Sequence, residues 1–343
     1  MMRLPLPWLL VLTGCTLALL LVGSLATGPM SLSLAESLQA LFAGAESGIE
    51  AHKLLIVQEI RLPRTLLCIA VGGILGLCGA VMQGLFRNPL ADPGIIGVSG
   101  GAALGAALAI VLLAPLGQQL QSLLGLGLLP LLAFLGGALT TTLVYLLGTR
   151  EGGTSVTVML LAGVAITALS GAVIGLLTYL ADDQMLRNLS LWQMGSLAAG
   201  KPVDVGLALA TLVALLWLFM RDANPLNALL LGEGEARHLG VNVQCLKRRL
   251  ILLTAAGVGV AVAVAGMIGF VGLVVPHLVR LLAGPNHVRL LPLSALLGAA
   301  LLLGADMLAR TLLAPAELPV GIITALLGAP FFIWLLVKSR RTL

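Results

Sequence analysis

The sequence predicts an all-α fold: a polytopic membrane protein with ten transmembrane helices and both termini in the cytoplasm. Hydrophobic residues make up 59% of the 343 residues and charged residues only 10%, whereas a soluble domain carries about 25% charged residues. The apolar runs are about 20 residues long, the length at which a helix crosses a bilayer, and they do not alternate like the roughly 10-residue strands of a barrel. These observations exclude a soluble enzyme and predict one transmembrane domain, residues 1–343, embedded in a lipid bilayer.

Nine apolar runs are clear. They cover residues 6–27, 65–86, 94–114, 123–147, 156–180, 203–220, 250–269, 290–309 and 319–337. A tenth run at 270–283 is short and contains Pro276, so its assignment depends on charge. With ten spans and a cytoplasmic N-terminus, 13 of the 19 Lys and Arg residues fall on the inner side, as the positive-inside rule requires. With nine spans, one of the basic clusters 247–249 and 338–341 would lie outside.

Small residues recur at four-residue spacing in several of these runs. The sets are Gly72 and Gly76; Gly97, Gly101 and Gly105; Gly171 and Gly175; and Gly257, Ala261, Ala265 and Gly269. Such faces let helix backbones approach closely. We expect most of them to pack helices within one chain rather than to form a seam between two chains.

Two long segments lie between the predicted spans. Residues 28–64 form the longest outer segment, predicted as a periplasmic loop, and residues 221–249 form the longest inner one. The inner segment predicts two short helices separated at Gly232-Glu-Gly234, because glycine permits a sharp turn. A compact helical pair on the cytoplasmic face predicts a docking element for a soluble partner.

The sequence contains no Walker A loop, whose Gly-Lys-Ser/Thr would hold phosphates. Lys338 is the only Lys followed by Ser or Thr, and Val337 precedes it. Intramembrane charge, the default marker of ion coupling, is nearly absent, and Asp306 has Arg310 at i+4, which favours an ion pair over a proton relay. We therefore expect a transport subunit that is not an enzyme and takes its energy from another polypeptide. A secondary carrier, which needs no ATPase, stays open as an alternative.

Gly97-Val-Ser-Gly100 raises a second alternative, an intramembrane serine protease with Ser99 as nucleophile and His277 as base. The match is four residues long, and a nucleophile motif counts only with its base and orienting group in context. The four histidines lie far apart and predict no metal site, and no cofactor is expected. The basic residues are scattered between apolar runs, so the net charge of +5 indicates topology rather than nucleic acid as a partner.

A series of longer motifs starts at Arg61. The motifs are Arg61-Leu-Pro-Arg64, Gly79-Ala-Val-Met-Gln-Gly84, Arg87-Asn-Pro-Leu-Ala-Asp-Pro93, Gly97-Val-Ser-Gly-Gly-Ala102, Trp192-Gln-Met-Gly-Ser196, Leu231-Gly-Glu-Gly-Glu-Ala-Arg-His-Leu-Gly240, Gly269-Phe-Val-Gly-Leu-Val-Val-Pro-His-Leu-Val-Arg280, Ala305-Asp306, Leu318-Pro-Val-Gly-Ile-Ile-Thr324 and Gly328-Ala-Pro-Phe331. In this order they resemble the FecCD-type permease family of ABC importers, which carries iron–siderophores, haem and vitamin B12. Within that family the chain as a whole is most similar to the bacterial haem (hemin) permeases.

The resemblance implies a ten-helix permease subunit in the bacterial inner membrane that works as a homodimer with two ABC ATPase subunits. A periplasmic binding protein would deliver the substrate, which is haem or a related iron chelate. A siderophore complex and cobalamin are the alternatives within the family. The fifth helix, here 156–180, would line the transport path.

The resemblance also implies three functional sites. They are binding-protein docking at Arg61, Arg64 and Arg310, a cytoplasmic gate at Asn88, Pro89 and Leu90, and ATPase coupling at Gly232, Glu233, Gly234, Glu235, Ala236, Arg237, His238, Leu239 and Gly240. The docking arginines would pair with glutamates on the two lobes of the binding protein.

Overall fold

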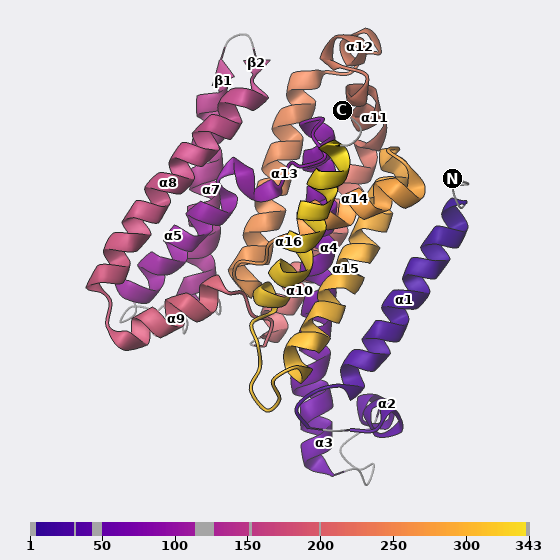
Figure 1. Ribbon diagram of the computed structural model, residues 1–343, viewed down its shortest axis with the longest axis vertical. Coiled ribbons are helices and arrows are strands. Elements are labelled where there is room, and N and C mark those ends of the chain that lie inside the picture. The colour runs from indigo at the N-terminus through magenta and orange to yellow at the C-terminus, as the bar shows by residue number, and fades with distance from the viewer. Residues whose placement is uncertain are drawn as a thin grey trace.

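The computed structural model of the chain describes residues 5–30, 32–42, 50–113, 127–150, 153–198 and 200–340. In this part of the chain the fold is helical, as predicted, apart from one hairpin of two-residue strands, β1 (Thr149–Arg150) and β2 (Gly153–Thr154). Figure 1 shows long helices that run roughly along the vertical axis.

Each of the ten predicted spans coincides with an apolar helix. Among the described residues, seven helices are long and apolar enough to cross a membrane. They are α1 (Leu6–Ala26), α4 (Leu62–Leu85, within the continuous helical stretch Ala51–Leu85), α7 (Leu128–Gly148), α8 (Val156–Leu180), α10 (Pro202–Arg221), α13 (Val243–Ala265) and α15 (His287–Thr311). The remaining predicted spans are occupied by α5 (Val98–Val111), α14 (Val271–Ala283) and α16 (Val320–Arg340). The last residue of the predicted span 94–114 and the start of the span 123–147 lie outside the described residues.

Shorter elements lie between these helices. They are α2 (Leu34–Phe42), α3 (Ala51–Leu55), the π-helical turn η1 (Ile56–Arg61), the 3-10 turn η2 (Pro93–Ile96), α9 (Asp183–Gln193), α11 (Ala223–Leu230) and α12 (Glu233–His238). Figure 1 places α11, α12, the start of α1 and the end of α16 toward one end of the bundle, called here the α12 end, and α2 and α3 at the opposite end, called the α3 end.

The two long segments between spans contain more helix than the sequence suggests. In the outer segment, α3 and η1 run without a break into α4, so Arg61 and Arg64 lie in helical backbone. In the inner segment, α10 ends at Arg221 and α13 begins at Val243, so residues 247–249 belong to a helix. A hydropathy pattern identifies only the apolar part of a membrane helix. The charged turns at the ends of the same helix are polar, so the sequence alone predicts them as loop.

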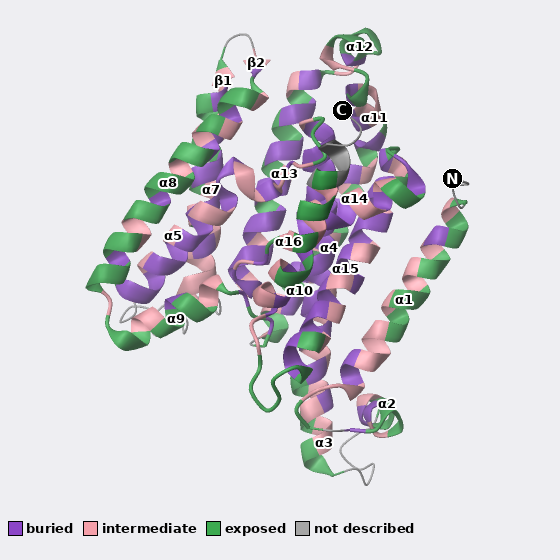
Figure 2. Cartoon of the chain, in the orientation of Figure 1, coloured by how far each residue is buried: buried purple, intermediate pink, exposed green. Residues whose placement is uncertain are grey.

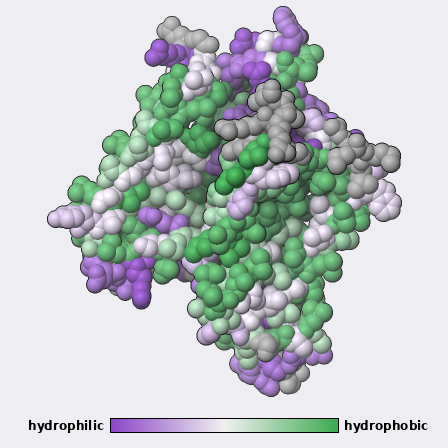
Figure 3. Space-filling model, in the orientation of Figure 1, coloured by the Kyte–Doolittle hydropathy of each residue, from purple (hydrophilic) through white to green (hydrophobic). Residues whose placement is uncertain are grey.

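Helix α4 is the centre of the bundle. It packs against α15, α10, α14 and α13, whereas α5, α7 and α8 pack mainly on one another and contact the centre through α13. Figure 2 shows the contrast between the buried inner helices and the exposed outer faces of α1 and α8. In Figure 3 hydrophobic residues cover much of the sides of the bundle and hydrophilic residues gather toward its two ends, which is the distribution that a bilayer requires.

Glycines allow the closest helix contacts. A Cβ atom at Gly72 of α4 would clash with the carbonyl oxygen of Gly298 in α15, and a Cβ at Gly101 of α5 would clash with the carbonyl oxygen of Gly136 in α7. The prediction that the small-residue faces pack helices within one chain is therefore confirmed for these two helix pairs.

Two of the apolar helices, α5 and α14, have 14 and 13 residues. At 1.5 Å per residue they are about 20 Å long, less than the roughly 30 Å of the hydrocarbon core. Backbone that is not α-helical precedes each of them: the segment between α4 and α5, which contains only the 3-10 turn η2, and the segment Gly266–Phe270. Such backbone is tolerated at membrane depth only where protein buries it or where it lines a cavity.

The Gly266–Phe270 segment is held by the loop that follows α9. Ser196 N donates to Ala265 O (2.8 Å), and Gly321 N at the start of α16 donates to Met194 O (3.1 Å). Gly195 adopts φ +71°, and a Cβ there would lie too close to Met267 O. The Trp192–Ser196 motif thus braces the break between α13 and α14.

Candidate functional site

A cluster of charged side chains is buried at the α3 end, between α4 and α15. Arg64 donates to Asp306 Oδ1 through Nε (3.0 Å) and Nη2 (2.9 Å), and to Glu317 Oε2 through Nη1 (2.7 Å). Arg310 lies one turn after Asp306, and its Nε is 3.0 Å from Asp306 Oδ2, although the N–H is not directed at that oxygen. The predicted i+4 ion pair is therefore confirmed, and two arginines share one fully buried carboxylate.

The other arginine contacts fix the end of α1. Arg61 donates to Leu25 O (2.7 Å) and Ala26 O (2.8 Å), which are among the last carbonyls of that helix. Arg310 Nη2 donates to Ser24 Oγ (2.7 Å). Helix-terminal carbonyls have no intrahelical partner, so these guanidinium groups satisfy acceptors that burial would otherwise leave unpaired.

The three predicted docking arginines are therefore buried rather than displayed. Arg61, Arg64 and Arg310 are 2–5% exposed. A cavity of about 220 Å³ reaches all three and also Glu317, whose side chain is 34% exposed. In the single chain these arginines join α1, α4 and α15, and their docking role stays a prediction.

The predicted gate residues follow α4 at the α12 end. Asn88 Oδ1 accepts a hydrogen bond from Leu90 N (2.9 Å), and Asn88 N donates to Gln83 O (3.2 Å). Asn88 and Pro89 are exposed and Leu90 is partly exposed. The segment is an exposed turn braced by its own hydrogen bonds, and its role as a gate stays a prediction.

The predicted coupling residues form a helical pair, as expected, with one difference. The turn between α11 and α12 uses Gly232, which has φ +123°, whereas Gly234 lies inside α12. Gly240, with φ +83°, ends the motif. In α12 only Ala236 is buried. Glu233 is partly buried, and the exposed residues of the motif are Gly234, Glu235, Arg237, His238, Leu239 and Gly240.

Two exposed leucines flank α12. Leu231 is 68% exposed and Leu239 is 63% exposed. Apolar side chains that are exposed singly are common on protein surfaces, so these two leucines do not by themselves assign a partner. The role of the helical pair as a docking element stays a prediction.

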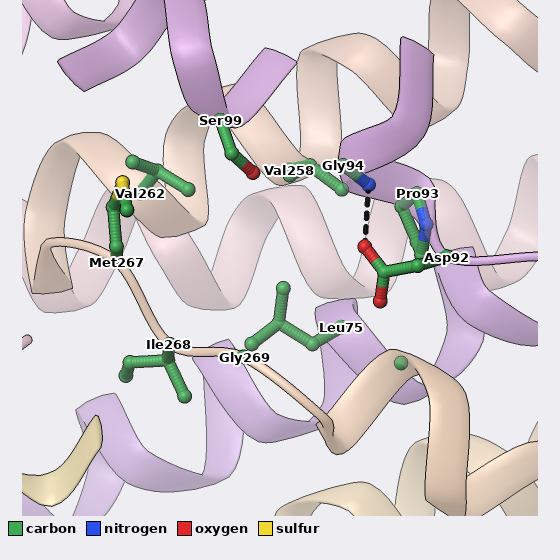
Figure 4. A pocket seen from close by; sticks show the side chains of 11 residues that line it. Leu75, Asp92, Pro93, Gly94, Ser99, Val258, Val262, Met267, Ile268 and Gly269 are labelled. Atoms are coloured by element: carbon green, nitrogen blue, oxygen red, sulfur yellow. Dashed lines mark hydrogen bonds between the residues drawn. The ribbon is translucent and has the colours of Figure 1, made fainter. Parts of the chain in front are cut away.

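A cavity of about 240 Å³ lies where the two non-helical breaks approach each other. Figure 4 shows Asp92 and Ser99 from the segment around η2, with Met267 and Ile268 from the Gly266–Phe270 break across from them. Asp92 Oδ1 accepts a hydrogen bond from Gly94 N (2.7 Å) and so caps η2.

Ser99 does not have the surroundings of a serine nucleophile. The described residues that line its cavity include no histidine. His277 instead stacks edge-on against Phe331 of α16, with ring centroids 6.1 Å apart. Without a base beside the hydroxyl, the four-residue match carries no protease chemistry.

The model of the FecCD transport family matches residues 16–338 of the chain. The chain belongs to the FecCD transport family. The Hemin transport system permease protein HmuU of Yersinia pestis is 47% identical over 342 residues, which cover 99% of this chain and 97% of that protein. The Vitamin B12 import system permease protein BtuC of Vibrio cholerae is 42% identical over 96% of this chain and 92% of that protein.

Solved structures show the same fold. An inward-facing structure assigned as a metal-chelate type ABC transporter is 34% identical, covers 97% of this chain and 99% of its own, and has a TM-score of 0.82. A second one, PsaBC from Streptococcus pneumoniae in complex with Fab, is 20% identical with a TM-score of 0.57. The second likeness concerns the fold alone.

Several residues that connect the helices at the α12 end of this FecCD family member lie outside the motifs found in the sequence. Asn227 Oδ1 accepts from His287 N (2.8 Å), so this atom must be the amide oxygen. The same oxygen lies 3.0 Å from His287 Nδ1, which must therefore carry the proton. His287 Nε2 faces Gly84, where a Cβ would clash with it. This joint links α11, α15 and α4.

A second set of missed residues lies in the first turns of α13. Arg249 forms a bidentate pair with Asp222 at the end of α10. Lys247 is buried and contacts both Glu233 of α12 and Thr154 of β2. In the sequence these two basic residues carry only a topology signal, because their partners are remote along the chain.

Proposed function

We propose that the chain is the transmembrane permease subunit of an ABC importer that moves haem (hemin) or a related iron chelate. The substrate would pass from a periplasmic binding protein to the cytoplasm of a bacterium, across its inner membrane. Two copies of the chain would work with two ATPase subunits, which hydrolyse ATP in its place. The observation that carries the proposal is the 47% identity to a hemin permease over nearly the full length of both chains.

The topology that we propose has ten spans with the α12 end in the cytoplasm. The start of α1 and the end of α16 lie toward that end in Figure 1, as an even number of crossings requires. The basic residues Arg87, Lys247 and Arg249 belong to this end, and their side is the cytoplasmic one by the positive-inside rule.

The transport path would run along α8 where two copies meet. A Cβ built on Gly171 or Gly175 of α8 would meet no atom of another described element within 4 Å, unlike one built on the packed glycines Gly72 of α4 and Gly101 of α5. Leu169 and Leu176 beside them are 66% and 59% exposed. An apolar path with few strong ligands suits a large flat chelate, because the substrate must leave again.

Reconstitution tests this function. The chain, its ATPase and its binding protein are placed in liposomes, and ATP hydrolysis and uptake are measured with hemin, a ferric siderophore or cobalamin. We expect hemin to stimulate hydrolysis and to accumulate inside. Stimulation by cobalamin or the siderophore alone would assign the chain to that substrate, and uptake by the chain without the ATPase would identify a secondary carrier.

The gate is tested by crosslinking. The exposed native cysteines Cys15 and Cys245 are first replaced by serine, and Asn88→Cys is then introduced. We expect a disulfide between two copies in one nucleotide state and less of it in the other, because Asn88 is exposed and a gate would bring its two copies together only when it is closed. The same yield in every state, or no crosslink, would leave the turn without a gating role.

A further inference from the structure

A buried lysine joins the coupling helix to the hairpin at the base of α8. Lys247 of α13 is 2% exposed. Its Nζ donates to Glu233 Oε1 of α12 (2.6 Å) and to Thr154 O of β2 (3.0 Å). A buried ammonium group is tolerated only when it is paired and hydrogen-bonded, so both contacts have to be kept while the charge stays buried.

The hairpin is seated on the same turn of α13 by a second residue. Gln244 Oε1 accepts a hydrogen bond from Thr154 N (3.0 Å). Thr154 thus has both backbone groups bonded to α13. Gly153 has φ +110°, and a Cβ there would clash with the Gln244 side chain. The hairpin therefore fits closely against this turn of α13 and is tied to it by hydrogen bonds to Gln244 and Lys247.

The residue after the hairpin begins α8. Ser155 is the N-cap of α8, and its Oγ accepts a hydrogen bond from Val158 N (3.4 Å). The line of contacts from α12 to α8 is thus Glu233, Lys247, Thr154 and Ser155. Each link is a hydrogen bond or a peptide bond, so a displacement of α12 pulls on the first turn of α8.

We propose that Lys247 is a positioning residue that transmits the movement of α12 to α8. When a partner subunit moves α12, the carboxylate of Glu233 carries the ammonium group with it, and the hairpin follows through Thr154. This inference rests on the proposed function, because it requires an ATPase that docks on α12 and a path along α8.

The test uses the complete complex of permease, ATPase and binding protein in liposomes. Lys247→Met keeps the length of the side chain and removes its charge. We expect uptake per ATP hydrolysed to fall roughly tenfold, within the usual range of coupling between sites, while ATP hydrolysis continues. Lys247→Arg keeps the charge and is expected to restore part of the uptake. The matched control is Arg248→Met, which removes an exposed charge from the adjacent position.

A second readout separates transmission from a simple loss of stability. A fluorophore is attached to Leu161→Cys on the exposed face of α8, in the background without Cys15 and Cys245. Nucleotide is expected to change its emission in the parent and in Arg248→Met, and not in Lys247→Met, at equal amounts of assembled complex. An unchanged response or unchanged uptake per ATP in Lys247→Met would overturn the inference. If the unsubstituted complex itself shows no ATP-dependent uptake, the proposed function fails instead.

Discussion

Asp306→Ala is expected to lower the free energy of unfolding by about 3–5 kcal/mol, because removal of one partner leaves the other charges buried and uncompensated. Arg310 would lose its only ion-pair partner among the described residues, and Arg64 would keep Glu317 alone. The expected change is large because Asp306 is fully buried. Unfolding of the purified chain in mild detergent, followed by helical signal against added denaturing detergent, measures it.

The matched control is Glu317→Gln, which changes the partly exposed partner of the same arginine. Ion pairs near solvent contribute about 0.2–1 kcal/mol, so this variant is expected to stay close to the parent. Similar losses in the two variants, or a loss below about 1 kcal/mol in Asp306→Ala, would show that the buried carboxylate does not hold α4 and α15 together.

Gly232→Val is expected to uncouple ATP hydrolysis from uptake while the chain still inserts in the membrane. Gly232 has φ +123° and ψ 156°, a backbone region that is essentially restricted to glycine, and strain there costs of the order of 1–3 kcal/mol. The turn between α11 and α12 would therefore change its path and displace Glu233 from Lys247. Uptake per ATP in the reconstituted complex is expected to fall by about 10- to 100-fold, since each 1.4 kcal/mol changes an equilibrium constant tenfold.

Gly234→Ala is the control for this substitution. Gly234 lies inside α12, a Cβ there meets no atom within 4 Å, and alanine favours a helix over glycine. Coupling is therefore expected to be kept. If Gly232→Val behaves like Gly234→Ala, the geometry of the turn does not matter for coupling, and the contact between α12 and its partner must be sought elsewhere.

The helices could be predicted from the sequence because each span is a local pattern. Even the short helix α14 follows from the run 270–283 together with the placement of the basic residues. The turn at Gly232-Glu-Gly234 could be predicted in the same way, but the sequence does not indicate which of the two glycines makes it. Only their backbone angles separate them, since one lies between helices and the other within one.

The partners of the buried charges could not be predicted. Arg64 and Asp306 are 242 residues apart along the chain, and hydropathy carries no information on pairs. For the same reason the basic cluster at 247–249 predicts only which side of the membrane this segment lies on. In the structure Lys247 bonds to Thr154 of β2 and Arg249 bonds to Asp222 at the end of α10, and the sequence predicts neither contact.

The glycine contact between α4 and α15 limits how the molecule can change shape. At Gly72 and Gly298 the two backbones touch, so neither helix can slide past the other without moving carbonyl groups through each other. These helices therefore behave as one rigid body. Because α5, α7 and α8 contact this body mainly through α13, rocking of one group against the other about α13 is the motion that the packing leaves available.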